Sequence, residues 1–148
     1  MKKNIFVALD FSNFDKAMDV AKSVKNHAAG LKITNELFAI CGKEGLKKFS
    51  EFGLDIFLDL KILDIPNTVR KTVASIESLK TVKYLTVHTS GDHDMLRAAR
   101  ETSDHLELLG VTVLTSQSSS KDQFNFLVNL AIKSKLSGVI ASAQEYGL

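Results

Sequence analysis

The sequence contains a single cysteine, Cys41, so no intrachain disulfide can form, which fits a reducing compartment. Cys41 follows the apolar residues 38–40, where a small buried side chain is favoured over a reactive thiol. Long apolar runs are lacking too. The stretch 5–9 is followed by Asp10 and is too short for a signal peptide or a membrane span. We therefore expect a cytoplasmic protein.

An excess of charge of one sign is also lacking. The formal net charge of the 148 residues is +2, which gives no reason to expect a nucleic-acid or membrane partner but permits anionic small molecules. The four histidines, at positions 27, 88, 93 and 105, make no metal-ligand cluster with the cysteine. The sequence has neither a Gly-x-Gly-x-x-Gly nor a Walker motif, so no residue pattern indicates a metal or a cofactor.

Short β-rich runs alternate with longer segments of helical periodicity. The runs are 4–9, 29–33, 55–60, 84–88, 110–114 and 138–141. The clearest helical pattern starts at Phe14, with Ser12 as its expected N-cap, and further helices are predicted around Val73, Ala98 and Leu127. This alternation predicts βαβ units, and hence an α/β fold with a parallel sheet and helices outside it.

The third predicted strand carries charges where a strand is usually apolar. Because side chains alternate between the two faces of a strand, Phe57, Asp59 and Lys61 should share one face, and the aliphatic residues at 56, 58 and 60 the other. The aliphatic face should pack under the helices. Burying charges is costly unless they are paired, so a structural ion pair is possible, but we favour a functional role for Asp59 and Lys61.

Polar residues also end the other predicted strands. In α/β barrels the active site lies at the carboxyl ends of the strands, so these residues are expected to line one mouth. They are Asp10, Lys32, Asp59, Lys61, Asp64, His88 and Ser116, with Thr115 beside the last.

Most of these residues also have a purely structural interpretation. Asp10 and Asp64 could each cap the helix that follows, because an aspartate before a helix often accepts hydrogen bonds from its first turn. Lys32 could be a solvated strand end. His88 could be a hydrogen-bonded residue of the rim without a catalytic role.

The segment 57–69, Phe-Leu-Asp-Leu-Lys-Ile-Leu-Asp-Ile-Pro-Asn-Thr-Val, resembles the signature of orotidine 5′-phosphate decarboxylases. The spacing Asp59-x-Lys61-x-x-Asp64 is shared by a wider suprafamily of sugar-phosphate enzymes, whereas the Ile-Pro-Asn-Thr that follows is specific to the orotidylate branch. Other segments resemble the family in order and spacing, namely 7–10, 30–32, 36–38, 86–88, 111–116 and 138–145.

The resemblance implies a TIM (β/α)8 barrel. It accounts for about six strand–helix modules within residues 1–148, whereas a closed barrel needs eight modules and typically ~200 residues or more. We therefore expect a single orotidine 5′-phosphate decarboxylase barrel domain that is truncated at its C-terminus. The family's grip on the substrate phosphate would lie in the two modules beyond.

The resemblance also implies an activity, the conversion of orotidine 5′-monophosphate to uridine 5′-monophosphate (UMP) in de novo pyrimidine biosynthesis without any cofactor or metal. By resemblance, Lys61 protonates the pyrimidine carbon, Asp59 lies near the departing carboxylate, and Asp64 belongs to the same catalytic array. The implied substrate-binding residues are Asp10 and Lys32 at the ribose, Thr115 and Ser116 at the pyrimidine edge, and Asn67, Thr68 and His88. Asp64 and Thr68 would reach the active site of the neighbouring subunit in a homodimer.

Two alternatives stay open on the sequence. One is a magnesium-dependent sugar-phosphate synthase or decarboxylase of the same suprafamily, against which the Ile-Pro-Asn-Thr run speaks. The other is a non-catalytic barrel remnant that binds a partner through open strand edges.

Overall fold

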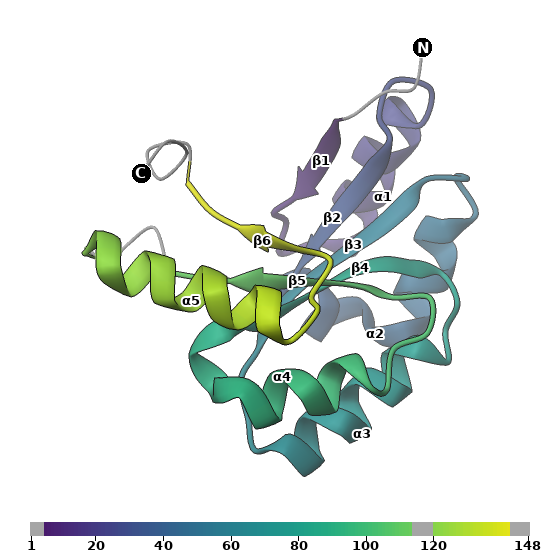
Figure 1. Cartoon of the computed structure of the whole chain (residues 1–148). Helices are drawn as coiled ribbons and strands as arrows, with labels where there is room; N and C mark the ends of the chain where they lie inside the picture. Colours follow the sequence, from purple (N-terminus) through teal and green to yellow (C-terminus); the bar gives the residue numbers. More distant parts are fainter. Residues whose placement is uncertain (1–4, 114–119, 143–148) are drawn as a thin grey trace. The chain divides into compact units, whose positions relative to one another are not determined.

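The structure is a computed structural model that describes residues 5–113 and 120–142. Within these ranges six strands alternate with helices in the α/β pattern of a partial TIM barrel, and the strand order is β1-β2-β3-β4-β5-β6 (Figure 1). The strands are β1 (Phe6–Leu9), β2 (Gly30–Thr34), β3 (Asp55–Ile62), β4 (Val82–His88), β5 (Glu107–Val111) and β6 (Gly138–Ile140). The helices are α1 (Phe14–Val24), α2 (Asn35–Ser50), α3 (Pro66–Glu77), the short 3₁₀ turn η1 (Thr89–Gly91), α4 (Asp92–Arg100) and α5 (Lys121–Lys133).

The predicted alternation of strands and helices is confirmed, but the bounds of the fifth strand were wrong. β5 begins at Glu107, three residues before the predicted start at position 110. The Glu77 carboxylate accepts hydrogen bonds from the backbone N–H groups of His105, at 3.2 Å, and Leu106, at 3.3 Å. This anchor lies on α3 and holds the chain just before β5, so the local pattern of residues gave no sign of it.

Two helix starts show how local chemistry sets the element bounds. The side chain of Asn13 caps α1 by accepting from the N–H of Lys16 at 2.9 Å, so the predicted cap, Ser12, was wrong by one residue. α3 begins with Pro66, because proline has the helical φ and needs no acceptor for an N–H.

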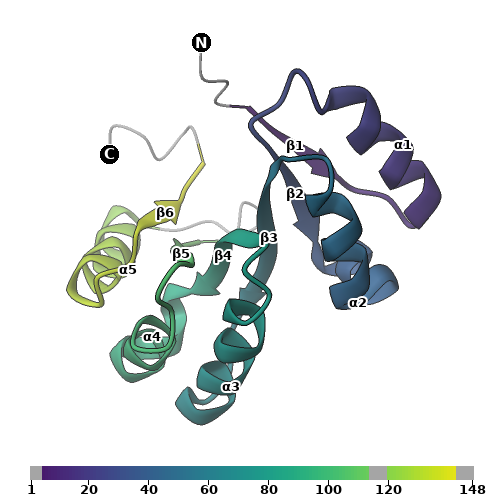
Figure 2. The ribbon, with the colours of Figure 1, turned by 90° about the vertical axis from the view of Figure 1, so that its right-hand side faces the viewer.

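The chain forms two compact units, the first made of residues 1–60 and 79–84 and the second of residues 61–78 and 85–148. In the first unit, parallel pairing sets Ala8 beside Lys32 and Lys32 beside Phe57. The intervening aliphatic side chains point the other way, toward α1 and α2, which lie on the same side of β1 and β2 (Figure 2). Four of them are fully buried, namely Leu31, Ile33, Ile56 and Leu58.

The opposite face of the first unit carries aromatic rings. Phe6, Phe57 and Tyr84 meet with ring centroids 5.5–6.0 Å apart in edge-on or tilted geometry. Gly30 makes room for this cluster, because a Cβ at that position would overlap the Phe6 ring and the carbonyl oxygen of Asp55.

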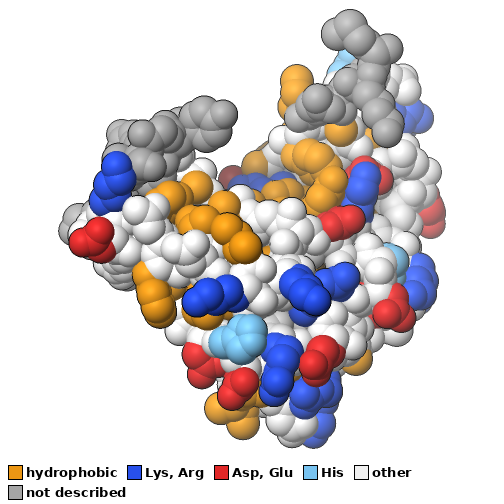
Figure 3. All heavy atoms as spheres, in the orientation of Figure 1, with side chains coloured by type: hydrophobic (Ala, Val, Ile, Leu, Met, Phe, Trp, Pro, Cys, Tyr) orange, Lys and Arg blue, Asp and Glu red, His pale blue; other side chains and the backbone are white. Residues whose placement is uncertain are grey.

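In the second unit, α3 contacts α4, α4 contacts α5, and α5 contacts β6. Its fully buried side chains include Val73, Leu85, Met95 and Leu108. Large apolar side chains also reach the surface of α5 and β6, namely Phe126, Ile132 and Val139, and hydrophobic side chains gather over these elements in Figure 3.

Among the described residues, no helix combines the length and the apolar character that crossing a bilayer requires.

We expect Gly30→Ala to lower the free energy of unfolding by roughly 1–3 kcal/mol, the usual effect of forcing an extra methyl into a packed site. Urea unfolding followed by circular dichroism measures the change. Gly138→Ala is the matched control. It also opens a strand, but there the added Cβ would meet only the flexible Leu109 side chain, at 3.3 Å. An equal decrease in the free energy of unfolding in Gly30→Ala and Gly138→Ala would contradict the packing described for Gly30.

Candidate active site

The first unit pairs two of the predicted site residues, Lys32 and Asp59. The Lys32 Nζ lies 3.8 Å from Asp59 Oδ2, and the side chains are 31% and 11% exposed. Lys32 is therefore not the solvated strand end that one interpretation of the sequence allowed. Because a carboxylate this buried is costly without a counter-charge, Lys32 stabilises Asp59 in its position.

The strand register explains why these two charges meet. Lys32 on β2 pairs with Phe57 on β3, and Thr34 pairs with Asp59. Asp59 lies two residues after the partner of Lys32, so the side chains of Lys32 and Asp59 lie on the same face of the sheet. This face lies opposite the one that packs on α1 and α2. Asp10, which follows β1, is exposed. It does not cap α1, because Asn13 does.

Lys61 starts the second unit and has an unusual backbone. Its φ is +50°, in the left-handed region that residues with a Cβ rarely adopt, although it lies inside β3. Such a conformation costs roughly 1–3 kcal/mol and persists only where the surroundings impose it. The predicted sharing of one face by Asp59 and Lys61 assumed an extended backbone throughout. The left-handed turn of the chain at Lys61 breaks that assumption.

The backbone N–H of Lys61 donates a hydrogen bond to the hydroxyl of Thr86 at 2.8 Å. Thr86 is fully buried on β4. Sequence reasoning did not select Thr86, although it lies two residues before His88 and therefore on the same face of its strand. That alternation was the signal that could have identified it.

His88 closes β4 and is half-buried. Burial and the positive charge of Lys61 lower the pKa of its imidazole from the ordinary value of 6.5. The Ser90 hydroxyl lies 3.1 Å from His88 Nδ1. The second unit thus brings together Lys61, Thr86 and His88, of which only the first and last were predicted.

The remaining predicted residues of the second unit lie at the start of α3. Asp64 Oδ1 accepts from the N–H of Ile65 at 2.7 Å, while the N-cap position is Ile65 and has no side-chain cap. The helix-capping interpretation of Asp64 is therefore wrong. Asp64, Asn67 and Thr68 are all exposed. The predicted pyrimidine-edge residues, Thr115 and Ser116, lie outside the described residues.

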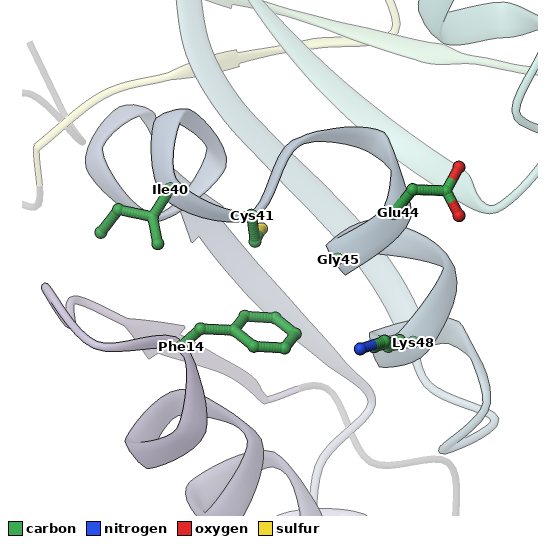
Figure 4. A pocket seen from close by; sticks show the side chains of 6 residues that line it. All are labelled: Phe14, Ile40, Cys41, Glu44, Gly45 and Lys48. Atoms are coloured by element: carbon green, nitrogen blue, oxygen red, sulfur yellow. The ribbon is translucent and has the colours of Figure 1, made fainter.

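A hollow in the first unit contains none of the predicted site residues (Figure 4). The ring of Phe14 points from α1 toward Cys41 and Lys48 on α2, and the Lys48 Nζ lies 5.5 Å from the ring centre. Burial raises the pKa of the Cys41 thiol above its ordinary value, which lowers its thiolate fraction and its reactivity. This agrees with the interpretation of Cys41 as a packing residue, although it is only half-buried.

Across residues 5–113 and 120–142, no group of three or more histidine, cysteine, aspartate or glutamate side chains is arranged to hold a metal ion.

The chain is similar to known proteins along nearly its whole length. Residues 3–147 match the family model described as "Orotidine 5'-phosphate decarboxylase / HUMPS family". The protein named orotidine 5′-phosphate decarboxylase from Novosphingobium aromaticivorans is 36% identical to it, over 99% of this chain and 70% of its own length. The protein of the same name from Carboxydothermus hydrogenoformans is 38% identical, over 100% of this chain and 69% of its own length. The crystal structure of orotidine 5′-phosphate decarboxylase from Lactobacillus acidophilus matches with a TM-score of 0.85 at 30% identity, over 97% of this chain and 73% of that one.

We expect the imidazole of His88 to titrate below pH 6.5 in the folded protein, and its pKa to rise in Lys61→Met, because that change removes the nearby positive charge. Proton NMR of the histidine C2–H signals measures both. Lys135→Met is the control, a lysine of the same unit that is exposed. A His88 pKa that does not move in Lys61→Met would contradict the proximity of the two groups.

The same shift predicts a pH dependence of stability. The unfolded chain protonates His88 at a higher pH than the folded one, so the free energy of unfolding falls as the pH drops below about 6.5. His88→Gln should lose less stability than the wild type between pH 7.5 and pH 5.5 in urea unfolding.

We also expect Lys61→Gly to unfold with a free energy roughly 1 kcal/mol higher than Lys61→Ala, because glycine adopts a positive φ without steric cost. Chemical denaturation of the two variants measures the difference. Lys135 has a φ of +56°, so the pair Lys135→Gly and Lys135→Ala provides a matched reference for the backbone effect alone. Lys61→Ala being the more stable variant would argue against the left-handed conformation.

Proposed function

The chain belongs to the orotidine 5′-phosphate decarboxylase / HUMPS family, and from that premise we propose that it decarboxylates orotidine 5′-monophosphate to UMP in pyrimidine biosynthesis. The observation that carries the proposal is the Asp59-x-Lys61-x-x-Asp64 array followed by Ile-Pro-Asn-Thr, inside a family match that spans residues 3–147. The matched proteins named above carry this activity in their names.

The chemical difficulty is the carbanion. When the bond between the pyrimidine ring and its carboxylate breaks, carbon dioxide leaves and the electron pair stays on the ring carbon. We assign to Lys61 the ammonium group that stabilises this charge and then transfers a proton to the carbon, forming the new C–H bond. The neutral amine left on Lys61 regains its proton from water.

Asp59 is assigned to a position near the departing carboxylate of the substrate. Its burial and its ion pair with Lys32 support this role, because both hold a negative charge in a fixed place before the substrate binds. In this assignment, Lys32 and Asp10 also bind the ribose hydroxyls. Asp64 is the third charged residue of the array and is assigned to the active site of the neighbouring subunit.

His88 is assigned to substrate binding in its neutral form. Its lowered pKa keeps the imidazole uncharged at neutral pH, so it places no second positive charge beside Lys61 and can still exchange hydrogen bonds with a bound ligand. Thr115 and Ser116, with Asn67, complete the proposed set of substrate contacts.

We further propose a cytoplasmic homodimer in which Asp64 and Thr68 act in the active site of the partner. Two large apolar side chains flank Asp64 and are exposed, Leu63 at 55% and Ile65 at 65%. Exposed apolar side chains beside polar groups are a common feature of surfaces that pack against another protein chain.

We expect Lys61→Ala to reduce kcat by at least about 10²–10³-fold, the loss that follows removal of a preorganised group that stabilises transition-state charge. The decrease in orotidylate absorbance measures turnover, and calorimetry with UMP tests whether the nucleotide still binds. Lys135→Ala should keep wild-type turnover. Wild-type kcat in Lys61→Ala would end the assignment of Lys61.

The same assay discriminates between the branches of the family. Turnover that persists in EDTA supports the decarboxylase proposal. Absence of orotidylate turnover, together with turnover of a sugar phosphate that is lost in EDTA and recovers with magnesium, would instead indicate the metal-dependent sugar-phosphate branch.

A further inference from the structure

We infer that Thr86 is a positioning residue for Lys61. Its hydroxyl accepts the backbone N–H of Lys61 and so holds that residue in the left-handed conformation from which its side chain projects. The inference deepens the proposed function, because it rests on Lys61 as the group that stabilises and protonates the carbanion.

The hydrogen bond joins parts of the chain 25 residues apart. The donor is on β3 and the acceptor on β4, both within the second unit, and their separation is 2.8 Å. The acceptor, Thr86, is fully buried, and the donor, Lys61, is half-buried, so water has limited access to this hydrogen bond. A part-buried N–H that loses its acceptor loses the free energy of the hydrogen bond, so the bond favours the backbone conformation in which it forms.

The conformation of Lys61 determines where its ammonium group can be. In an extended strand the Cβ direction alternates by residue, and a change of φ from negative to positive reorients the Cβ relative to its neighbours. Holding a reacting group in one orientation is a major part of catalysis, and small misplacements reduce the rate strongly. Thr86 itself is not assigned to any contact with the substrate.

The same strand also carries His88, two residues after Thr86 and on the same face. β4 therefore carries two residues that interact with Lys61. Thr86 accepts a hydrogen bond from its backbone, and the pKa of His88 responds to its charge. A valine at 86 would fill the same volume without accepting a hydrogen bond, and a serine would keep the acceptor, so the two variants separate packing from positioning.

In turnover assays, Thr86→Val should lower kcat by at least about tenfold, as expected for a misplaced reacting group, while KM stays within about threefold. Thr86→Ser should keep kcat within about threefold of the wild-type value, because serine keeps the hydroxyl acceptor. Thr112→Val is the matched control, because Thr112 is also buried in the second unit and its hydroxyl donates to the carbonyl of Ile140 at 3.1 Å. Wild-type kcat in Thr86→Val, or an equal loss in Thr112→Val, would overturn the inference.

A second measurement does not need turnover. NMR chemical shifts of the backbone should give a positive φ for Lys61 in the wild type and in Thr86→Ser, and a negative φ in Thr86→Val. Exchange of the Lys61 amide hydrogen should accelerate at least about tenfold in Thr86→Val relative to Thr112→Val.

These results distinguish the two levels of the proposal. If the wild-type protein forms no UMP, the proposed function is refuted. The φ of Lys61 and the exchange rate of its amide hydrogen still test the role of Thr86 in that case. A negative φ in the wild type overturns the role of Thr86 even if Thr86→Val does not fold.

Discussion

Burial of one aliphatic face of the strands against α1 and α2 is the constraint on which the rest of the first unit depends. Leu31, Ile33, Ile56 and Leu58 meet it, and all four are fully buried. Because side chains alternate along a strand, the same register leaves the residues between them for the opposite face. That face begins with the ring cluster of Phe6 and ends with charges, so packing on one side determines where the chemistry can be on the other.

Charges on a buried face must be stabilised by groups already present in the fold. Asp59 achieves this through Lys32, which the parallel pairing of β2 and β3 delivers to the same face. In the second unit the equivalent support acts on the backbone, since Thr86 accepts the N–H of Lys61. In both cases a neighbouring strand, and not a residue nearby in sequence, holds the group in place, which fits the preorganisation that charge-stabilising catalysis requires.

Parts of the fold were predictable and others were not, for identifiable reasons. The strands and most helices follow from periodicity, because burial of one face leaves a regular signal. The helix α2 followed only from the alternation, and no helical face was identified for it, since its glycines are poor helix formers and the chain is kinked at Gly42, where φ is +55°. The early start of β5 depends on Glu77, a distant anchor, and the cap of α1 moved by one residue because Asn13 and Ser12 are both good capping types.

By itself, the sequence determined the α/β class, the family and the order of the charged array, because these depend on residue types and their spacing. The tertiary structure decided which partners those charges have and how Lys61 is oriented. Alternation along β3 predicted an extended Lys61, but its φ of +50° coincides with a hydrogen bond to a residue 25 positions away. A conformation that is unfavourable locally is stable only when a long-range contact compensates for it, and a contact of that kind exists only in the folded chain.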